Sequence, residues 1–335
     1  MARTQFVTRY DFRAPGADPD VRREIFGRAI EQAAYVESHG MGALMLSEHH
    51  SSADGYLPSP IPVAAAFAAV TSTIPISVSA LLVNLYDPIR LAEDMVVLDH
   101  LSGGRVSYTI GLGYREEEYA LFGKPWSTRG HDIEATIGVL LQAWTGEEFE
   151  HEGRRVQVTP TPYSRPHPVL FYGGGSPAAA KRAARLGLHF QPQDSDPALK
   201  QVYDDECRAQ GREPGFTMQA RPGPANVFCT ADPDAFWAKH GHHLLADAQA
   251  YAAWRGANTS SYVRDDSSTV EEMKAAGTYV VLTPSDLIEK SLSKEIHLVT
   301  SHPACGGLPA EPSWESVRLI CETVMPAVRA SQVPS

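Results

Sequence analysis

Short apolar runs alternate with longer amphipathic stretches along most of this 335-residue chain, and this alternation limits the folds open to it. The pattern is typical of successive strand–helix units that build a parallel sheet. The apolar runs that predict strands are residues 5–10, 41–46, 76–83, 106–110, 169–172, 188–190, 225–229 and 296–300. About eight such units close a barrel. We therefore predict an α/β fold, a single (β/α)8 TIM-type barrel. An open doubly wound sheet is the alternative, because periodicity cannot show closure.

One segment, residues 240–278, fits the alternation least well. Long irregular insertions in compact enzymes are usually lids or binding loops, so we predict a lid-like insertion here, before the last strand. We expect its three histidines, His240, His242 and His243, to be exposed or part of the lid rather than metal ligands. No linker or internal repeat interrupts the chain, and we expect one domain over residues 1–335.

Charge and composition exclude several classes of protein. The formal net charge of −11 leaves no basic surface to neutralise phosphates, so we expect no nucleic-acid partner. No stretch approaches the roughly 20 apolar residues of a membrane span, and residues 1–6 lack the hydrophobic region of a signal peptide. The four cysteines are far apart in the sequence, which indicates reduced thiols rather than disulfides or a zinc site. We therefore expect a cytoplasmic protein.

The second predicted strand ends abruptly in the polar residues Ser47, Glu48, His49 and His50. Three ionisable side chains at the carboxyl end of a buried strand are costly unless they line a site. An imidazole beside a carboxylate can also transfer protons near neutral pH. We predict a catalytic site here, with a polar surface turn as the alternative.

A glycine-rich turn, residues 173–177 (GGGSP), follows the fifth predicted strand and opens a helix. Its backbone N–H groups, the Ser176 hydroxyl and the positive end of the helix dipole would form a cradle for an anion. Lys181 and Arg182 lie one turn further on and could add positive charge. The turn is neither a Walker A sequence nor a dinucleotide-binding fingerprint, and a plain tight turn is the alternative.

The fourth predicted strand ends in a third candidate motif, which contains Gly111, Gly113, Tyr114 and Arg115. Glycines at a strand end permit the close approach of a flat ligand or its phosphate. Tyr114 could stack on such a ligand, and Arg115 could pair with an anion. The acidic run that follows, residues 116–118, is typical of a solvated helix start, where the helix dipole favours negative charge.

Together these motifs resemble the bacterial luciferase-like flavin monooxygenases over nearly the whole chain. The stretches that carry the resemblance are residues 47–50 (SEHH), 85–94 (LYDPIRLAED), 98–105 (LDHLSGGR), 111–114 (GLGY), 173–176 (GGGS), 305–309 (CGGLP) and 324–328 (VMPAV). The block from residue 87 to residue 105 is the most specific, because both its spacing and its residue types match. Its first residues also predict the start of a helix, with Asp87 as the cap and Pro88 at the first position.

The resemblance implies a barrel that binds a flavin at its carboxyl-terminal face. A separate flavin reductase would supply reduced FMN, and O2 would then oxidise a small organic substrate through a flavin hydroperoxide. By position, His49 matches the family's catalytic histidine, and Ser79–Ala80 matches a site where members often carry a non-proline cis peptide bond. The family commonly pairs its barrels, so we expect a homodimer. The predicted cofactor-binding residues are Glu48, Ser79, Ala80, Gly111, Gly113, Tyr114, Arg115, Gly174, Gly175 and Ser176.

The chain departs from the family at one phosphate-binding position. Many relatives carry an arginine between the glycines of the strand-four motif, where this chain has Leu112. The phosphate would then depend on Arg115, Lys181 or Arg182. A deazaflavin that transfers hydride without O2 is an alternative cofactor on the same barrel.

A metal-dependent hydrolase is the alternative from a different class, built from Glu48, His49 and His50 with His131 and Asp132. Neighbouring residues on an extended strand point to opposite faces, so we do not expect the two adjacent histidines to share an ion. A non-catalytic flavin-binding barrel is the remaining alternative. The sequence does not give the substrate, because specificity in such barrels lies in loops without a transferable pattern.

Overall fold

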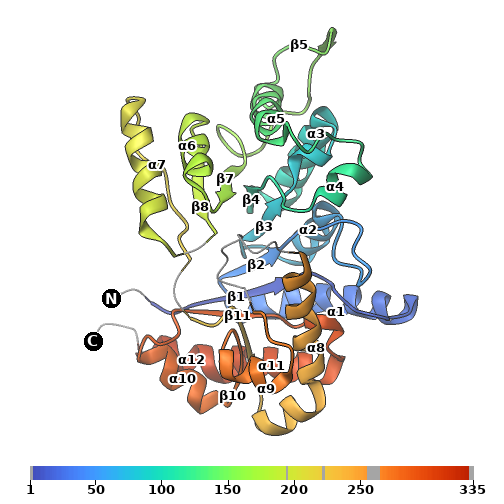
Figure 1. Ribbon diagram of the computed structural model, residues 1–335, viewed down its shortest axis with the longest axis vertical. Helices are drawn as coiled ribbons and strands as arrows, with labels where there is room; N and C mark the ends of the chain where they lie inside the picture. Colours follow the sequence, from blue (N-terminus) through green and yellow to red (C-terminus); the bar gives the residue numbers. More distant parts are fainter. Residues whose placement is uncertain (1–2, 194, 221–222, 255–264, 332–335) are drawn as a thin grey trace. The chain divides into compact units, whose positions relative to one another are not determined.

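The computed structural model describes residues 3–193, 195–220, 223–254 and 265–331. They group into two compact units, shown in Figure 1. Unit 1 comprises Met1–Met45, Ser52–Leu57 and Arg221–Ser335, and unit 2 comprises Leu46–Ser51 and Pro58–Ala220. In each unit, strands and helices alternate along the chain, which confirms the α/β class. One domain over residues 1–335 stays a prediction.

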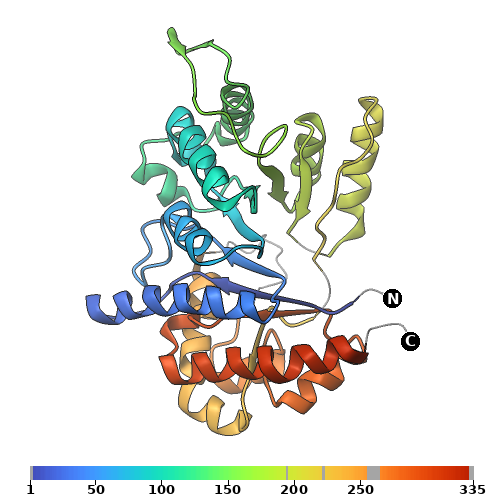
Figure 2. The same cartoon turned by 180° about the vertical axis from the view of Figure 1, so that it is seen from behind.

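Unit 1 is built on a parallel sheet in which Gln5 pairs with Leu298 and Tyr279 pairs with Asn226. In spatial order its strands are β10 (Tyr279–Leu282), β9 (Asn226–Cys229), β11 (Leu298–Ser301), β1 (Gln5–Tyr10) and β2 (Ala43–Leu46). Its helical segments are α1 (Pro19–Ser38), α8 (Pro233–Trp254), α9 (Val270–Ala276), α10 (Pro284–Leu292), η2 (Cys305–Gly307), α11 (Ala310–Leu319), η3 (Ile320–Val324) and α12 (Met325–Ser331). Figure 2 shows α1 lying along the helix that α11, η3 and α12 form together.

Unit 2 contains a sheet of parallel strands and a separate antiparallel hairpin. The sheet has the order β3 (Ile76–Leu81), β4 (Val106–Ile110), β7 (Val169–Gly174) and β8 (His189–Pro192). The hairpin is formed by β5 (Phe149–His151) and β6 (Arg154–Val156). The helical segments are α2 (Pro60–Val70), η1 (Val83–Leu85), α3 (Pro88–Ser102), α4 (Glu116–Leu121), α5 (Arg129–Ala143), α6 (Pro177–Arg185) and α7 (Pro197–Ala209).

The two faces of the unit 2 sheet differ in polarity. On β3, Ile76 and Val78 are fully buried, whereas Ser77 and Ser79 between them are half-buried. Side chains alternate between the two faces of a strand. The apolar face is thus covered, and the opposite face carries hydroxyl side chains.

Helix α3 shows how local sequence sets an element's limits. The Asp87 side chain accepts hydrogen bonds from the backbone N–H groups of Ile89 (3.0 Å) and Arg90 (2.9 Å), and Pro88 occupies the first helical turn. Gly103 ends the helix in the left-handed conformation, with φ of 63°. The predicted start of this helix is therefore confirmed.

The predicted insertion over residues 240–278 differs from the structure in its first part. His240–Trp254 forms the end of helix α8, and Leu244, Asp247 and Ala248 are buried there. The sequence pattern missed this helix because its buried side includes polar and glycine positions. Residues 255–264 lie outside the described part of the chain. Strand β10, which follows directly, was not predicted, so the segment precedes the last two strands rather than the last one.

The same helix changes the interpretation of the three histidines. His240 is buried and His243 half-buried, so the expected exposure was wrong for both. His243 Nδ1 lies 2.8 Å from the backbone oxygen of Gly306.

Among the helices in the described ranges, none combines the length and the apolarity that crossing a bilayer requires.

Candidate active site

All the residues predicted to bind the cofactor or to act in catalysis belong to unit 2. In this parallel sheet Ser79 pairs with Thr109, and Thr109 pairs with Phe171. The carboxyl ends of β3, β4 and β7 therefore meet at one edge, the edge at which α/β barrels bind their ligands. This edge carries Ser79–Ala80, Gly111–Arg115 and the turn at residues 173–176.

The peptide bond between Ser79 and Ala80 is cis, which confirms that prediction. The neighbouring strand approaches this bond closely. A Cβ atom at Gly111 would lie 2.8 Å from the Ala80 Cβ, so only glycine fits there. Gly113 has φ of 71°, a backbone conformation that also favours glycine. Close packing at Gly111 and the backbone conformation of Gly113 thus explain why both positions of the strand-four motif are glycines.

His49 lies in a short hydrogen-bonded chain and is only 7% exposed. Its Nδ1 is 2.8 Å from Glu118 Oε1, and its Nε2 is 3.0 Å from the Tyr114 hydroxyl. An ionised carboxylate can only accept hydrogen bonds, so Nδ1 carries a proton. In the neutral ring Nε2 is then the acceptor, and the Tyr114 hydroxyl donates to it. The arrangement can hold and move a proton at Nε2.

Glu118 is the anchor of this chain, and sequence analysis assigned it wrongly. Its side chain is fully buried, whereas Glu116 and Glu117 are exposed as expected of a solvated helix start. Glu118 Oε1 also accepts from the His50 backbone N–H (2.9 Å). The signal that could have found it is the helical spacing: Glu118 follows Arg115 by three residues, which places both on one side of the turn.

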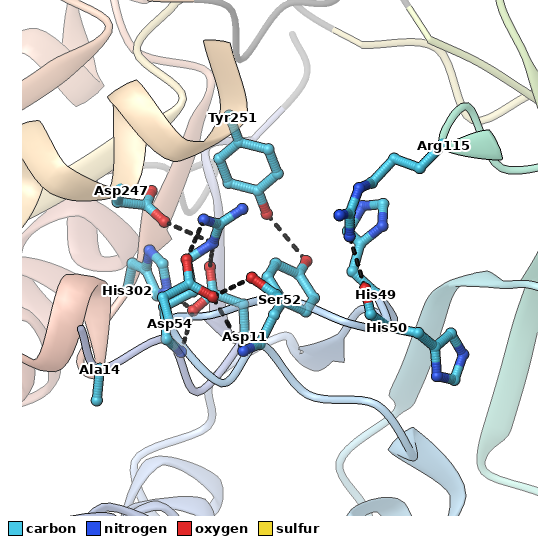
Figure 3. Close-up of polar contacts among 12 residues, drawn as sticks. Asp11, Ala14, His49, His50, Ser52, Asp54, Arg115, Asp247, Tyr251 and His302 are labelled. Carbon is cyan, nitrogen blue, oxygen red and sulfur yellow. Dashed lines mark hydrogen bonds and ion pairs between the residues drawn. The ribbon is translucent and has the colours of Figure 1, made fainter. Parts of the chain in front are cut away.

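The electrostatics of Glu118 follow from these partners. Burial acts to raise the pKa of its carboxyl. The hydrogen bond and charge of His49, the His50 N–H and the Arg115 guanidinium outweigh burial and hold that pKa below its usual value. Arg115 Nη1 lies 3.4 Å from Glu118 Oε1 and donates to the His50 backbone oxygen (2.6 Å). The structure thus places Arg115 within the His49–Glu118 group, as Figure 3 shows for Arg115, His49 and His50.

Glu48 and His50 form a second buried pair. Glu48 Oε1 accepts from His50 Nε2 (2.8 Å) and from the Tyr86 hydroxyl (2.6 Å), and Oε2 accepts from the Leu82 N–H (2.7 Å). Burial, together with the Glu48 charge, raises the pKa of Tyr86 well above its ordinary value, so the hydroxyl stays protonated. Both Glu48 oxygens thus bind protein groups. Tyr86, which contacts Glu48, was not among the residues predicted for the site.

The metal alternative finds no shared site around these histidines. His49 and His50 bind different carboxylates, as the opposite orientation of adjacent residues predicts. The side chain of His131 is 88% exposed, with its Nδ1 3.5 Å from Asp132. A metal ligand set needs several donors directed at one point, and these residues do not provide it.

The glycine-rich turn opens helix α6 as predicted. The Ser176 hydroxyl accepts from the Ala179 N–H at 3.2 Å and caps the helix. A Cβ at Gly174 would lie 2.5 Å from the Ala179 Cβ, so the turn packs too tightly for any other residue there. Gly175 and Ser176 are exposed, and among the described residues neither backbone N–H has a hydrogen-bond partner.

The basic residues near this turn differ in availability. Arg182 donates to Glu134 (2.6 Å) and to the Tyr172 hydroxyl (3.2 Å), and Arg185 also binds Glu134. Lys181 is exposed, and no acidic residue of the described chain pairs with it. Arg115, Lys181 and Arg182 are the basic residues predicted to bind the phosphate. Among the described residues, Lys181 is the one of these that has no carboxylate partner.

The most specific block of the resemblance, residues 87–105, has a structural role. Asp99 accepts from the backbone N–H (2.7 Å) and hydroxyl (2.8 Å) of Ser164. Arg105 donates to Ala68 and Thr71 oxygens at the end of α2, and to the Ile74 oxygen. Carbonyl groups at a helix end lack intrahelical partners, and Arg105 supplies them.

Unit 1 contains a buried charge cluster that sequence analysis missed. Asp11 and Arg13 follow β1, His302 follows β11, and Asp247 belongs to α8; each is at most 1% exposed. Arg13 donates to Asp54 (2.6 Å) and its Nε lies 3.3 Å from Asp247 Oδ1. Figure 3 labels Asp11, Asp54, Asp247 and His302 of this cluster. The signal was present in the sequence, because charged residues directly after the first predicted strand obey the same edge rule as residues 48–50.

The cluster neutralises itself. Asp247, His302 and Cys305 offer ligand atoms within 4.8 Å of one another, a spacing that suggests a metal site. However, Asp247 faces Arg13 with one oxygen and accepts from the Tyr279 hydroxyl (2.6 Å) with the other. Burial raises the pKa of Asp247. Burial acts in the same direction on Asp11, but His302 and the two nearby arginines lower the pKa of Asp11 overall. The Arg13 guanidinium thus already provides the positive charge beside Asp247 that a metal ion would supply.

A family model described as luciferase-like monooxygenase matches residues 10–293, and the chain belongs to this family. The FMNH2-dependent dimethylsulfone monooxygenase of Pseudomonas putida is 27% identical over 237 residues, which cover 64% of this chain and 61% of that protein. The chain spans about half the length of other curated relatives, 48% and 45% for two uncharacterised proteins of Sinorhizobium fredii.

Solved structures share the fold. The monooxygenase RslO1 from Streptomyces bottropensis superposes with a TM-score of 0.76 at 20% identity, covering 96% of this chain and 99% of that chain. An F420-dependent secondary alcohol dehydrogenase in complex with an F420–acetone adduct gives a TM-score of 0.69 at 17% identity, covering 98% and 99%. The predicted fold class is thus confirmed, and a monooxygenase and an F420-dependent dehydrogenase share it.

Proposed function

We propose that the chain is a monooxygenase that uses O2 and reduced FMN, delivered by a separate flavin reductase, to oxidise a small organic substrate. The observation that carries the proposal is the buried His49–Glu118 pair. His49 is hydrogen-bonded to Tyr114, which follows β4, and the same sheet edge carries the turn capped by Ser176. A proton-handling imidazole and an anion cradle at one sheet edge are what a flavin oxygenase needs. Because a reductase partner has to supply the flavin, we place the reaction in the cytoplasm.

The residues present fit a flavin phosphate. The exposed N–H groups of Gly175 and Ser176 and the start of α6 would hold the phosphate, and Lys181 would add charge. When bound, the reduced flavin supplies the electrons that activate O2. His49, oriented by Glu118, would hold or accept a proton at Nε2, and the Tyr114 hydroxyl would be the group through which it acts.

The charge around helix α6 favours FMN over a deazaflavin. Arg182 and Arg185 are both paired with Glu134, so Lys181 is the one cation of α6 left for a ligand among the described residues. A single phosphate matches this charge. The natural deazaflavin cofactor carries further carboxylates on its side chain, and these would need more positive charge than α6 presents.

A binding titration tests the cofactor, with FMN, riboflavin and the deazaflavin as ligands and flavin fluorescence as the readout. We expect Ser176→Ala to weaken FMN binding and to leave riboflavin binding nearly unchanged, since only FMN carries the phosphate. Thr283→Ala is the matched control, because Thr283 caps the equally long helix α10 with the same 3.2 Å bond. Tighter binding of the deazaflavin than of FMN would overturn the choice of cofactor.

Oxygen consumption tests the reaction. With a flavin reductase and a panel of candidate substrates, we expect substrate-dependent O2 uptake, and His49→Ala should lower it by about 10²- to 10⁴-fold while the fold persists. His49 contributes little to the core, because its contacts are with Glu118 and Tyr114 at the sheet edge. An absence of saturable flavin binding, or full turnover in His49→Ala, would contradict the proposal.

We also propose a homodimer formed through helices α2 and α3. These helices pack against each other and expose Val70 (40%), Val97 (53%) and Leu101 (61%). Exposed apolar side chains gathered on neighbouring helices are typical of protein interfaces. The molar mass from light scattering should correspond to two chains, and Leu101→Glu should shift it to one. A monomeric wild type would refute this.

A further inference from the structure

A small polar cluster lies at the carboxyl ends of strands in unit 2. Thr109 Oγ1 on β4 donates to the side-chain oxygen of Gln191 on β8 at 2.5 Å. Ser79 Oγ on β3 makes a longer contact of 3.4 Å with the same oxygen. Three strands thus direct side chains to one point, on the half-buried face of the sheet.

Strand β7 lies between β4 and β8, and a glycine in it makes the contact possible. Gly173 pairs with Gln191 in the register of the two strands. A Cβ at Gly173 would lie 2.9 Å from the Thr109 methyl group, so any side chain there would displace Thr109. The missing side chain lets Gln191 reach across β7 to Thr109. The glycine-rich turn therefore has a second role beside binding an anion.

In the structure the carboxamide oxygen of Gln191 faces the hydroxyls of Thr109 and Ser79. Its oxygen receives both hydroxyl contacts, so its nitrogen points away from them with two N–H donors. Among the described residues none accepts a hydrogen bond from this nitrogen. A half-buried amide whose oxygen is held and whose donors remain available is suited to bind an acceptor.

We propose that Gln191 is a positioning residue of the flavin site, which donates a carboxamide N–H to an acceptor atom of the bound ring. The inference rests on the proposed function. Ser79 begins the Ser79–Ala80 segment predicted to contact the flavin ring, and Gly173 begins the turn predicted to bind its phosphate. Gln191 contacts Ser79 and is paired with Gly173 in the register of the strands. The carbonyl oxygens and ring nitrogens of a flavin are acceptors, and negative charge gathers on them when the ring is reduced.

Two variants distinguish the effect of the Gln191 N–H donors from that of the rest of its side chain. Gln191→Met keeps the length of the side chain and removes all hydrogen bonding. Gln191→Glu keeps an acceptor for the Thr109 hydroxyl but replaces the N–H donors with a negative charge. Ser107→Ala is the control, because Ser107 is half-buried on the same strand and face as Thr109, two residues away. Dissociation constants for oxidised FMN and, without oxygen, for reduced FMN are measured by fluorescence, with melting curves to verify folding.

The expected result is a loss of about tenfold in FMN affinity for Gln191→Met, the effect of one neutral hydrogen bond. Gln191→Glu should weaken reduced FMN more than oxidised FMN, because like charges repel, whereas Ser107→Ala should bind as the wild type does. Wild-type affinity in Gln191→Met, or equal losses in all three variants, would overturn the inference while the proposed function stands. A wild type that binds neither flavin nor deazaflavin would overturn both.

Discussion

Replacement of Glu118 by glutamine tests whether the negative charge of this residue supports proton uptake by His49. The change keeps the shape of the side chain and removes its charge. The carboxylate makes contacts of 2.8 Å with His49, 2.9 Å with the His50 N–H and 3.4 Å with Arg115, all through Oε1. A carboxamide oxygen in the same place can still accept these hydrogen bonds. The negative charge that favours a protonated imidazole is lost.

The size of the effect follows from these contacts. Hydrogen bonds to charged groups contribute about 1.5–3 kcal/mol. With glutamine retaining part of the network, we expect a loss of about 2 kcal/mol in the free energy of unfolding. For a chain of 335 residues, with an unfolding entropy of roughly 2.1 cal/mol/K per residue, this lowers Tm by about 3 °C. Turnover should fall by about 10²-fold, the lower end of what a positioned base contributes, because His49 accepts a proton less readily without the carboxylate beside it.

The assay combines turnover with the nitrogen NMR shifts of His49 across pH, which report the protonation of its ring directly. Glu117→Gln is the matched control, since Glu117 is exposed on the same helix. If Glu118→Gln leaves the protonation of His49 and the turnover unchanged, or if Glu117→Gln loses as much activity, the reasoning is refuted.

The same variant predicts a pH dependence of stability. The pKa of Glu118 is lower in the folded protein than its usual value of 4.5, so the ionised form stabilises the fold. This contribution is complete above the unfolded pKa and is lost as pH falls through the folded one. The difference in Tm between wild type and Glu118→Gln should therefore narrow below about pH 4.5. A difference that is constant down to pH 3 would contradict the assigned charge.

Three further substitutions address the scaffold. Arg105→Ala should lower the free energy of unfolding by about 3 kcal/mol in denaturant titration, because several bonds to helix ends are lost, with FMN affinity unchanged. Gly174→Ala places a Cβ 2.5 Å from that of Ala179 and should cost about 1–3 kcal/mol, which a melting curve detects. Arg13→Met leaves Asp247 without its cation and should cost about 3–5 kcal/mol at pH 7. That last loss should shrink in acid, where Asp247, whose pKa is already raised, becomes neutral.

Much of the fold could be predicted from periodicity because strands and helices bury side chains at different intervals. The strand at residues 106–110 and the capped helix that begins after Asp87 depend on local pattern and capping, and both are confirmed. The helix over His240–Trp254 could not be found in this way, because its buried side includes His240, Gly241 and Asp247. Tertiary contacts, not apolar spacing, make those positions interior.

The location of the candidate site could be predicted from local sequence patterns. Polar residues that follow buried strands, and glycines that open a helix, meet at one sheet edge in any parallel arrangement, so His49, Gly113 and Ser176 could be named in advance. The sequence also carried the family's structural block, which the contacts of Asp99 and Arg105 explain.

The tertiary structure alone decided which of the charged residues act together. The three-residue spacing places Glu118 on the same side of the turn as Arg115, but only the fold shows that this side is buried against His49. The same holds for Gln191, whose reach to Thr109 depends on the glycine of an intervening strand. Burial and the pairing of charges depend on which distant segments meet, and a one-dimensional pattern does not contain those distances.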